Sequence, residues 1–355
     1  MSSVSGFEGL ADALALEAKV ELVSIRREAN VYPKRRDLQW AIKKLGFVGT
    51  EKEKTAIAPL SPFWNEQNKD LTQLVIKVFE ASPSNTFLLL MALEDQFDAA
   101  LLKVSAQLRK RIIVVAHQPP AWYRLNWRDF TAFNGLGGIV CVSESQKDFF
   151  SKVTVAPLLG IKHGVKSDFF SPQPLPEFDG GKRLLFVGQW LRDLDLLEQA
   201  MHFVWRQQPD TKLDCVIPRA ARSHPALYRL ACDERVAWHA DLDADTLRNL
   251  YRRATLLFLP LIDSTANNAI IEALASGLAI VSTRVGGVEE YVHSEFGELC
   301  TIGDVFAHAE AVLRWLDDAG RRAKAGALGR DFAVQNLDWG RISGDLLNQL
   351  ESIVA

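Results

Sequence analysis

The chain has 355 residues, of which 48% are hydrophobic and 24% are charged, and its formal net charge is −3 at pH 7. This length predicts two domains of ordinary size, and the negative net charge argues against nucleic-acid binding. The four cysteines are far apart and have no CxxC spacing, so we expect reduced, mostly buried thiols rather than disulfides or a zinc site. We expect neither a signal peptide nor a membrane span, because no uncharged run reaches the roughly 18 residues that a span needs.

The first half predicts an α/β region that ends in a linker. The expected helices cover residues 7–18, 71–80 and 96–108, the expected strands cover 20–25, 86–90, 112–116 and 139–142, and 50–65 are expected to form a loop. Residues 171–181 contain three prolines and two glycines, which is typical of a linker.

The second half predicts a regular alternation of strands and helices. The expected strands are 183–187, 212–217, 235–238, 255–261 and 278–282, and the expected helices are 194–207, 243–253 and 268–276. Such alternation favours right-handed crossovers and a parallel sheet in each half, so the predicted fold class is α/β with two Rossmann-like domains.

The most informative stretch runs from Leu256 to Val292. A polar loop, 263–267, follows an apolar strand and leads into a helix, and after a second strand, 278–282, the glycine pair Gly286-Gly287 opens the next helix. In a parallel sheet both loops lie at the carboxyl ends of the strands, where ligands of open α/β folds bind. The N-terminus of the helix fits a diphosphate, and Glu272, about one turn further on, offers two oxygens for the hydroxyls of a ribose. The pattern therefore predicts a nucleotide-sugar pocket.

Three segments resemble one known family. Residues 267–277 followed by Gly286-Gly287-Val288-Glu289-Glu290 resemble the donor-site signature of retaining GT-B glycosyltransferases of family 4. His163-Gly164-Val165 with residues 168–172 is similar to the family's HGV…DxFxP segment, and residues 141–145 are similar to its VSxxx segment.

The resemblance implies a GT-B fold with two Rossmann-like domains that face each other across a cleft. It implies an acceptor-side domain at residues 1–172, a donor-binding domain at 173–334, and a C-terminal tail, 335–355, that packs back on the first domain. It also implies transfer from a nucleotide-diphosphate sugar with retention of the anomeric configuration, with no metal or other cofactor.

The candidate site residues fall into three groups. Candidate catalytic residues are His117, Arg192 and Glu272. Candidate donor-binding residues, Glu272 included, are Ser5, Gly6, Gly188, Asp263, Ser264, Asn267, Asn268, Ala269, Gly286 and Gly287. Candidate acceptor-binding residues are Trp122 and Tyr123, for which a core position is the alternative.

Two positions depart from the family pattern. Ser264, with Asp263 beside it, stands where the family usually has a glutamate that touches the transferred sugar. Arg192 is the one cation soon after the strand at 183–187, where the family usually has an arginine and a lysine. The identity of the sugar and the catalytic competence of the site therefore stay open at this point.

Three other functions remain as alternatives. These are a nucleotide-sugar epimerase of the same fold, a non-catalytic nucleotide-sugar-binding protein and, least favoured because no GxGxxG follows an early strand, a nicotinamide-binding protein. The expected partners are a nucleotide-sugar donor and a glycan or lipid-linked acceptor. We expect a cytoplasmic protein. Residues 1–170 have 22 Lys+Arg against 18 Asp+Glu, which fits binding of the first domain to an anionic membrane surface. Solvated helix faces are the alternative explanation of these charges.

Overall fold

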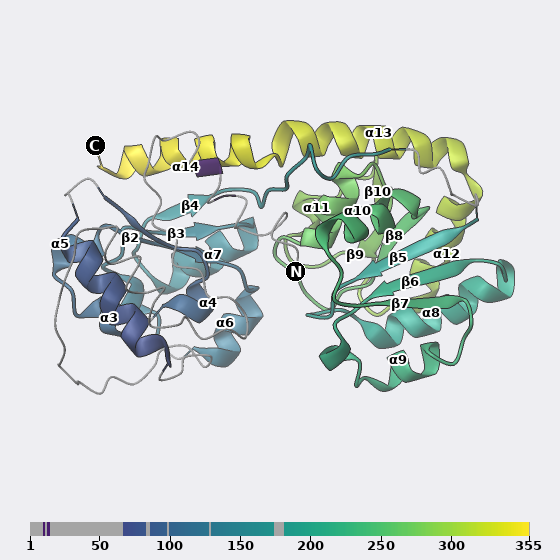
Figure 1. The fold of residues 1–355 in the computed structure, drawn as a ribbon, viewed down its shortest axis with the longest axis horizontal. Coiled ribbons are helices and arrows are strands. Elements are labelled where there is room, and N and C mark those ends of the chain that lie inside the picture. The colour runs from purple at the N-terminus through teal and green to yellow at the C-terminus, as the bar shows by residue number, and fades with distance from the viewer. Residues whose placement is uncertain are drawn as a thin grey trace.

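The computed structural model describes residues 67–82, 86–97, 99–127, 129–173 and 181–354, together with Leu10, Ala13 and Leu14. The helix expected at 7–18, the strand at 20–25, the loop at 50–65 and the candidate residues Ser5 and Gly6 lie wholly or mostly outside these residues. Figure 1 shows two α/β units side by side, with two C-terminal helices running along both.

The first domain is a parallel sheet with strand order β1-β2-β3-β4 and helices between the strands. Its elements are α3 (Gln67–Glu80), β1 (Leu88–Leu90), α4 (Leu93–Gln96), the 3₁₀ helix η1 (Ala99–Leu102), α5 (Ala106–Arg109), β2 (Ile112–Ala116), α6 (Pro120–Asn126), η2 (Thr131–Phe133), β3 (Gly138–Cys141), α7 (Glu144–Val153) and β4 (Leu158–Gly160). All residues of β2 and β3 are buried, as expected for strands covered on both faces.

The single helix expected at 96–108 is wrong. The segment forms the end of α4, the turn η1 and the short helix α5 instead. Ser105 is extended and its side chain accepts a hydrogen bond from the backbone N–H of Leu108, which starts α5 as a separate helix.

The second domain is a six-stranded parallel sheet with order β10-β9-β8-β5-β6-β7. Its elements are β5 (Arg183–Val187), α8 (Leu194–Gln207), β6 (Lys212–Val216), η3 (Arg219–Ala221), α9 (Pro225–Leu230), β7 (Val236–His239), α10 (Ala244–Arg253), β8 (Leu256–Leu259), α11 (Asn268–Ala275), β9 (Ile280–Thr283), η4 (Val288–Glu290), β10 (Gly297–Cys300) and α12 (Val305–Asp317). The strand order reverses direction between β5 and β8, which makes this the topological switch point where such sheets bind ligands.

The C-terminal helices α13 (Ala319–Asn336) and α14 (Trp339–Val354) connect the two domains (Figure 1). On α14, Trp339, Ile342 and Leu346 are buried against the first sheet, in a cluster with Ile113 and Val140. The tail therefore contributes to the core of the first domain.

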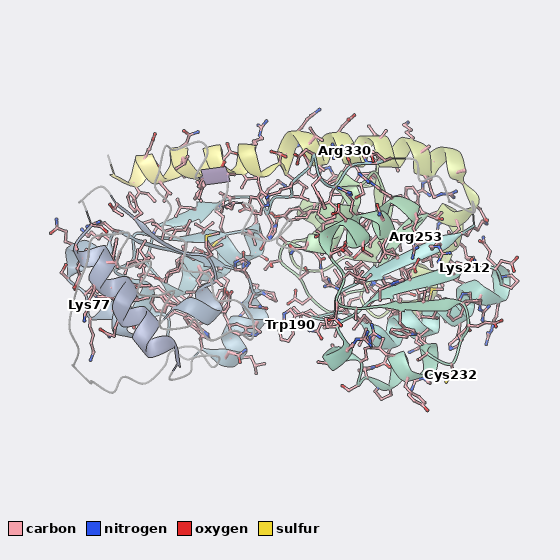
Figure 2. All side chains as sticks on the ribbon, in the orientation of Figure 1. Lys77, Trp190, Lys212, Cys232, Arg253 and Arg330 are labelled. Carbon is pink, nitrogen blue, oxygen red and sulfur yellow. The ribbon has the colours of Figure 1, made fainter. Side chains whose placement is uncertain are left out.

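Arg330 joins α13 to the segment before the linker and to the end of α11. Its guanidinium donates to the carbonyl oxygens of Ser167, Phe170 and Ala275. Figure 2 labels Arg330 on α13, above the second domain. No helix in the described residues is long and apolar enough to cross a bilayer.

Candidate functional site

The switch point of the second sheet holds the first group of candidate residues. Gly188 directly follows β5, its φ of +93° belongs to the left-handed region, and a Cβ there would lie 2.7 Å from the guanidinium of Arg192. A glycine is therefore needed both for the turn and for the close approach of Arg192.

Arg192 is fixed by three acceptors. Its Nε donates to the carbonyl of Val187 at 2.9 Å, its Nη1 to the carbonyl of Trp190 at 3.0 Å and its Nη2 to Oδ1 of Asn267 at 3.3 Å. Burial lowers the pKa of Arg192 to about 10, so it remains a cation at neutral pH. The structure thus brings Arg192 to the N-terminus of α11, as the sequence predicts.

Asn267 is the N-cap of α11. Its Oδ1 accepts the N–H of Ala269 at 3.1 Å in addition to the bond from Arg192. The N–H of Ala269 is therefore used by the cap in this structure, and its contact with the donor stays a prediction. Asn268 is the first residue of the helix and lies beside the capped turn.

Glu272 lies in the middle of α11 and is only 3% exposed. Every other residue of the helix from Ala269 to Ala275 is also buried, and all of those are apolar. The phenol of Tyr251, on α10, donates to Oε2 of Glu272 at 2.6 Å. Burial, together with the charge of Glu272, raises the pKa of Tyr251 well above its usual value, so the phenol stays protonated and acts as a donor.

The loops after β8 and β9 are packed against each other. The N–H of Gly287 donates to the carbonyl of Ser264 at 3.0 Å, and a Cβ on Gly286, with φ of +50°, would overlap that same carbonyl. Asp263, half-buried beside it, accepts the N–H of Ser264 at 2.8 Å, and burial raises the pKa of its carboxyl group. The loop that contains Asp263 and Ser264 therefore packs directly against Gly286 and Gly287 at the predicted donor site.

His117 follows β2 and reaches the same place from the first domain. Its Nε2 is 2.6 Å from the carbonyl of Met91, which favours a donating Nε2–H, and its own carbonyl accepts the hydroxyl of Thr265 at 2.6 Å. Thr265 belongs to the loop that precedes α11. The structure thus places His117 against the predicted donor loop.

Glu94 is a buried carboxylate that the sequence analysis missed. Its Oε1 accepts the backbone N–H groups of His117 and Gln118 at 2.7 and 2.8 Å, and also the phenol of Tyr123. The sequence gives no signal for this role, since the partners lie 23 to 29 positions away.

Gln146 was also missed, although it directly follows the VSxxx segment. Its side chain donates to the carbonyls of Ala116 and Gln118 and accepts the N–H of Val142. It joins the ends of β2 and β3 and so positions the chain around His117.

The interpretation of Trp122 and Tyr123 as an acceptor platform is wrong. Their exposed fractions are 7% and 0%, and both side chains belong to the first domain's core, where Tyr123 stacks on Phe149. α6 turns these rings inward because its buried face covers the sheet and α7.

The carboxyl edges of the two sheets are joined by hydrogen bonds. The indole of Trp190, labelled between the domains in Figure 2, donates to Oε1 of Gln118 at 2.9 Å. The phenol of Tyr291 donates to the carbonyl of Val142 at 2.8 Å and accepts the N–H of His163 at 2.9 Å. The contact with Tyr291 uses the backbone N–H of His163. Burial lowers the pKa of the His163 ring to about 3, so the ring is neutral.

A second anchor lies at the start of α7. Ser143 caps this helix with its side chain, and the N–H of Glu144 donates to Oε1 of Glu290 at 2.9 Å. Lys162 donates to the carbonyl of Glu290 at 2.8 Å. In the described residues, no group of three or more side chains has the composition of a metal site.

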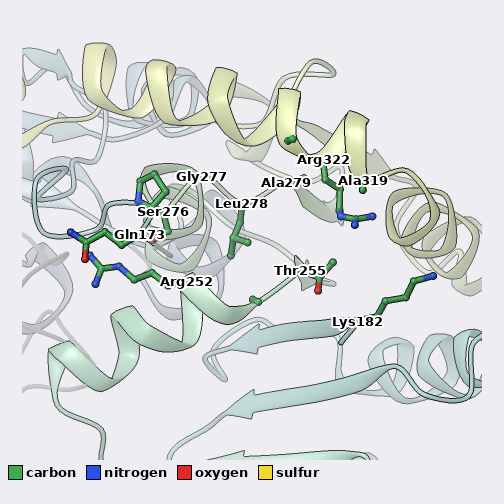
Figure 3. A pocket seen from close by; sticks show the side chains of 13 residues that line it. Gln173, Lys182, Arg252, Thr255, Ser276, Gly277, Leu278, Ala279, Ala319 and Arg322 are labelled. Carbon is green, nitrogen blue, oxygen red and sulfur yellow. The ribbon is translucent and has the colours of Figure 1, made fainter. Parts of the chain in front are cut away.

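A cavity of about 550 Å³ lies elsewhere, at the amino ends of β8 and β9 (Figure 3). It is lined by Lys182, Arg252, Arg322 and Ser276, among others. The three cations already have protein partners: Arg252 donates to Ser171, Arg322 to carbonyls at the end of α12, and Lys182 to Gln208 and Asp317. This cavity is on the opposite edge of the sheet from the predicted donor site.

Comparisons with known proteins agree with this geometry. Residues 181–318 match the family profile described as Glycosyl transferases group 1. The chain is 34% identical over 127 residues to the D-inositol 3-phosphate glycosyltransferase of Salinispora tropica, a match that covers 36% of this chain and 26% of that protein. It is 29% identical over 167 residues to a GDP-mannose-dependent monoacylated alpha-(1-6)-phosphatidylinositol monomannoside mannosyltransferase of Corynebacterium glutamicum, covering 44% of this chain and 43% of that protein. The chain thus spans between about a quarter and a half of these relatives.

Solved structures share the whole two-domain architecture. The structure of Anabaena HepE in complex with UDP-glucose superposes with a TM-score of 0.63 at 18% identity, over 80% of this chain and 84% of that one. Sucrose-phosphate synthase from Thermosynechococcus elongatus gives a TM-score of 0.59 at 22% identity, over 68% of each chain. The fold is therefore GT-B, and residues 181–318 of the second domain are similar to the glycosyl transferases group 1 profile.

Proposed function

We propose that this protein is a retaining glycosyltransferase that moves a sugar from a nucleotide-diphosphate sugar to an acceptor hydroxyl. The observation that carries the proposal is the arrangement of Arg192, Asn267 and Glu272 around α11 at the switch point of the sheet. A cation and a helix N-terminus suit a diphosphate, and a carboxylate one turn further suits a ribose.

The chemistry follows from the leaving group. As the bond between the anomeric carbon and the diphosphate oxygen breaks, negative charge grows on the diphosphate, and Arg192 with the first turn of α11 stabilises it. The acceptor oxygen forms the new bond on the same face of the sugar, and its proton passes to the departing diphosphate. This path retains the anomeric configuration and uses no metal.

The sugar itself occupies the space between the two domains in this proposal. His117, held by Glu94 and bonded through its carbonyl to Thr265, faces the donor loop from the first domain. Asp263 and Ser264 stand where related enzymes have a glutamate, so we propose that Asp263 takes over the contact with the transferred sugar. Asp263 is the one acidic residue of the loop 263–267, and its carboxylate is half-buried.

The acceptor is proposed to be a polyol or glycolipid hydroxyl presented at the cytoplasmic face of a membrane. Two relatives are named for inositol phosphate and phosphatidylinositol mannoside acceptors. The excess of Lys and Arg over Asp and Glu in residues 1–170 fits an anionic lipid surface.

The test is a transfer assay with UDP- and GDP-sugars, in which release of the nucleoside diphosphate and the anomeric configuration of the product are measured together. The proposal predicts an acceptor-dependent product with the donor's own configuration. An inverted product would exclude the retaining mechanism. Nucleotide binding without turnover would instead indicate a binding protein, and donor conversion without an acceptor product an epimerase.

A further inference from the structure

Glu272 is the one charged residue among the buried residues 269–275 of α11, and the others are apolar. It is 3% exposed, and its neighbours Ile271 and Ala273 are fully buried. A carboxylate in such surroundings is retained only if hydrogen bonds satisfy it, because desolvation of the charge is costly. The contact with Tyr251 at 2.6 Å supplies one of these bonds from a different helix, α10.

The ring of Tyr251 cannot easily turn away. It is fully buried and meets the ring of Phe170 edge-on, with centroids 5.8 Å apart and an interplanar angle of 90°. The carbonyl of Phe170 is held by Arg330 of α13. Phe170 belongs to the DxFxP segment, whose function the donor site alone does not explain.

We propose that Tyr251 is a positioning residue that aligns the carboxylate of Glu272 for the two hydroxyls of the donor's ribose. This inference rests on the proposed function and adds to it a residue that touches the carboxylate rather than the nucleotide. A carboxylate has about four lone-pair sites, so a bond from Tyr251 to Oε2 leaves capacity for ribose hydroxyls. A carboxylate held in one rotamer loses less conformational entropy when the ribose binds.

The electrostatic surroundings support the same role. Arg192 is close enough to Tyr251 for its positive charge to counteract, in part, the rise in the phenol's pKa. Because burial and Glu272 outweigh this effect, the phenol keeps its proton across the physiological range and remains a donor. Tyr251 therefore interacts with both the residue proposed for the diphosphate and the residue proposed for the ribose.

The experiment measures discrimination between ribose and deoxyribose. Calorimetric titration of UDP and 2′-deoxy-UDP, or of GDP and 2′-deoxy-GDP, gives an affinity ratio for the full-length wild type, Tyr251→Phe, Glu272→Gln and the double variant. We expect Tyr251→Phe to lower this ratio by about three- to tenfold, the effect of one hydrogen bond. In the Glu272→Gln background the same substitution should change nothing further, because the two residues act as one unit.

The matched control is Tyr228→Phe on α9, which removes a phenol from a side chain that is 76% exposed in the same domain. It should leave the ratio unchanged. A folded Tyr251→Phe variant with the wild-type ratio would overturn the inference while the effect of Glu272→Gln still supports the proposed function. If Glu272→Gln also keeps the wild-type ratio, the ribose assignment itself fails.

A second measurement does not depend on the variant's stability. In a structure of the wild-type protein with bound nucleoside diphosphate, the Tyr251 phenol should still donate to Glu272 while Glu272 contacts the ribose. A carboxylate that turns away from Tyr251 to reach the ribose would contradict the positioning role.

Discussion

Arg192 is preorganised by hydrogen bonds within the protein. Its guanidinium is held by two backbone carbonyls and by the cap residue of α11, so its position is set before a ligand arrives. A fixed cation stabilises the transition state more than a mobile one, because the protein does not have to reorganise while negative charge develops on the leaving group.

We therefore expect Arg192→Ala to lower kcat by about two to three orders of magnitude, and Arg192→Lys to recover only part of the loss, because a point charge lacks the planar fork of donors. Steady-state kinetics at saturating donor measure this. Arg314→Ala is the control, since Arg314 is half exposed on α12 and pairs with Glu298. Unchanged turnover in folded Arg192→Ala would remove the residue from catalysis.

A second residue-scale prediction concerns acid stability. Asp214 is 1% exposed and accepts hydrogen bonds from His239, Arg183 and Arg253. Burial alone would raise the pKa of Asp214, but the bond from His239 and the two guanidinium charges outweigh it and lower the pKa. A lowered folded-state pKa stabilises the fold above the unfolded value, about 3.9, and this stability is lost as the pH falls through the folded value.

Asp214→Ala should therefore destabilise the protein by about 3–5 kcal/mol near pH 7, because three partners lose a buried acceptor. Urea unfolding at a series of pH values measures the difference between the wild type and the variant. The difference should shrink below about pH 4, where Asp214 of the unfolded chain binds a proton while Asp214 of the folded wild type is still charged. A difference that stays constant down to pH 2 would contradict this account.

The residues that the sequence could predict are those of the contiguous donor signature. Residues 267–277 and the glycine pair can be compared with a motif directly, and Arg192 is a lone cation after a strand. Glu94, Gln146 and Tyr251 could not be predicted, because each acts on a residue 21 to 30 positions away that only the fold brings near. Trp122 and Tyr123 were misassigned because aromatic residues look alike in a core and in a binding surface.

Among the elements, the strands of the second domain were the most predictable. Strand 183–187 and helix 194–207 agree with β5 and α8, because buried parallel strands are continuous apolar runs and α8 has a clear apolar face. The six-residue α9 was missed, since it is too short to show a period and depends on Pro225 at its first turn and the cap His224. Short helices of this kind are set by caps rather than by pattern.

Two glycines in the loops of the second domain, Gly286 and Gly303, give a prediction in which one serves as the control for the other. Gly286 and Gly303 both have positive φ, +50° and +74°, but a Cβ at Gly286 would collide with Ser264 whereas nothing lies within 4 Å of one at Gly303. Gly303→Ala should cost only backbone strain, about 1–2 kcal/mol. Gly286→Ala should in addition displace the donor loop and weaken nucleotide binding at least about tenfold, the equivalent of 1.4 kcal/mol.

Thermal unfolding and calorimetric titration of both variants separate the two effects. If Gly286→Ala and Gly303→Ala bind nucleotide equally well, the packing of the two loops does not shape the donor site.

At the scale of the whole molecule, the two domains meet at the carboxyl edges of their sheets and are tied together by α13 and α14 (Figure 1). Tyr291 is the most buried of the bridging residues, at 1% exposed, and it bonds both Val142 and His163 of the first domain. A reaction that needs groups from both domains depends on such contacts.

Tyr291→Phe should therefore reduce transfer more than donor binding. The substitution leaves a buried carbonyl at Val142 and a buried N–H at His163 without this partner, at a cost of about 1–3 kcal/mol each. The nucleotide site lies within the second domain and should be largely preserved. Measured values of kcat and of the nucleotide Kd decide the matter: parallel loss of both, or of binding alone, would contradict a role in joining the domains.

The most direct test of the account is a crystal structure of the protein with bound UDP or GDP. The account predicts the diphosphate between Arg192 and the first turn of α11, with the ribose hydroxyls on Glu272. Nucleotide bound at the opposite edge of the sheet, in the cavity lined by Lys182, Arg252 and Arg322, with Arg192 and Glu272 unchanged, would contradict it.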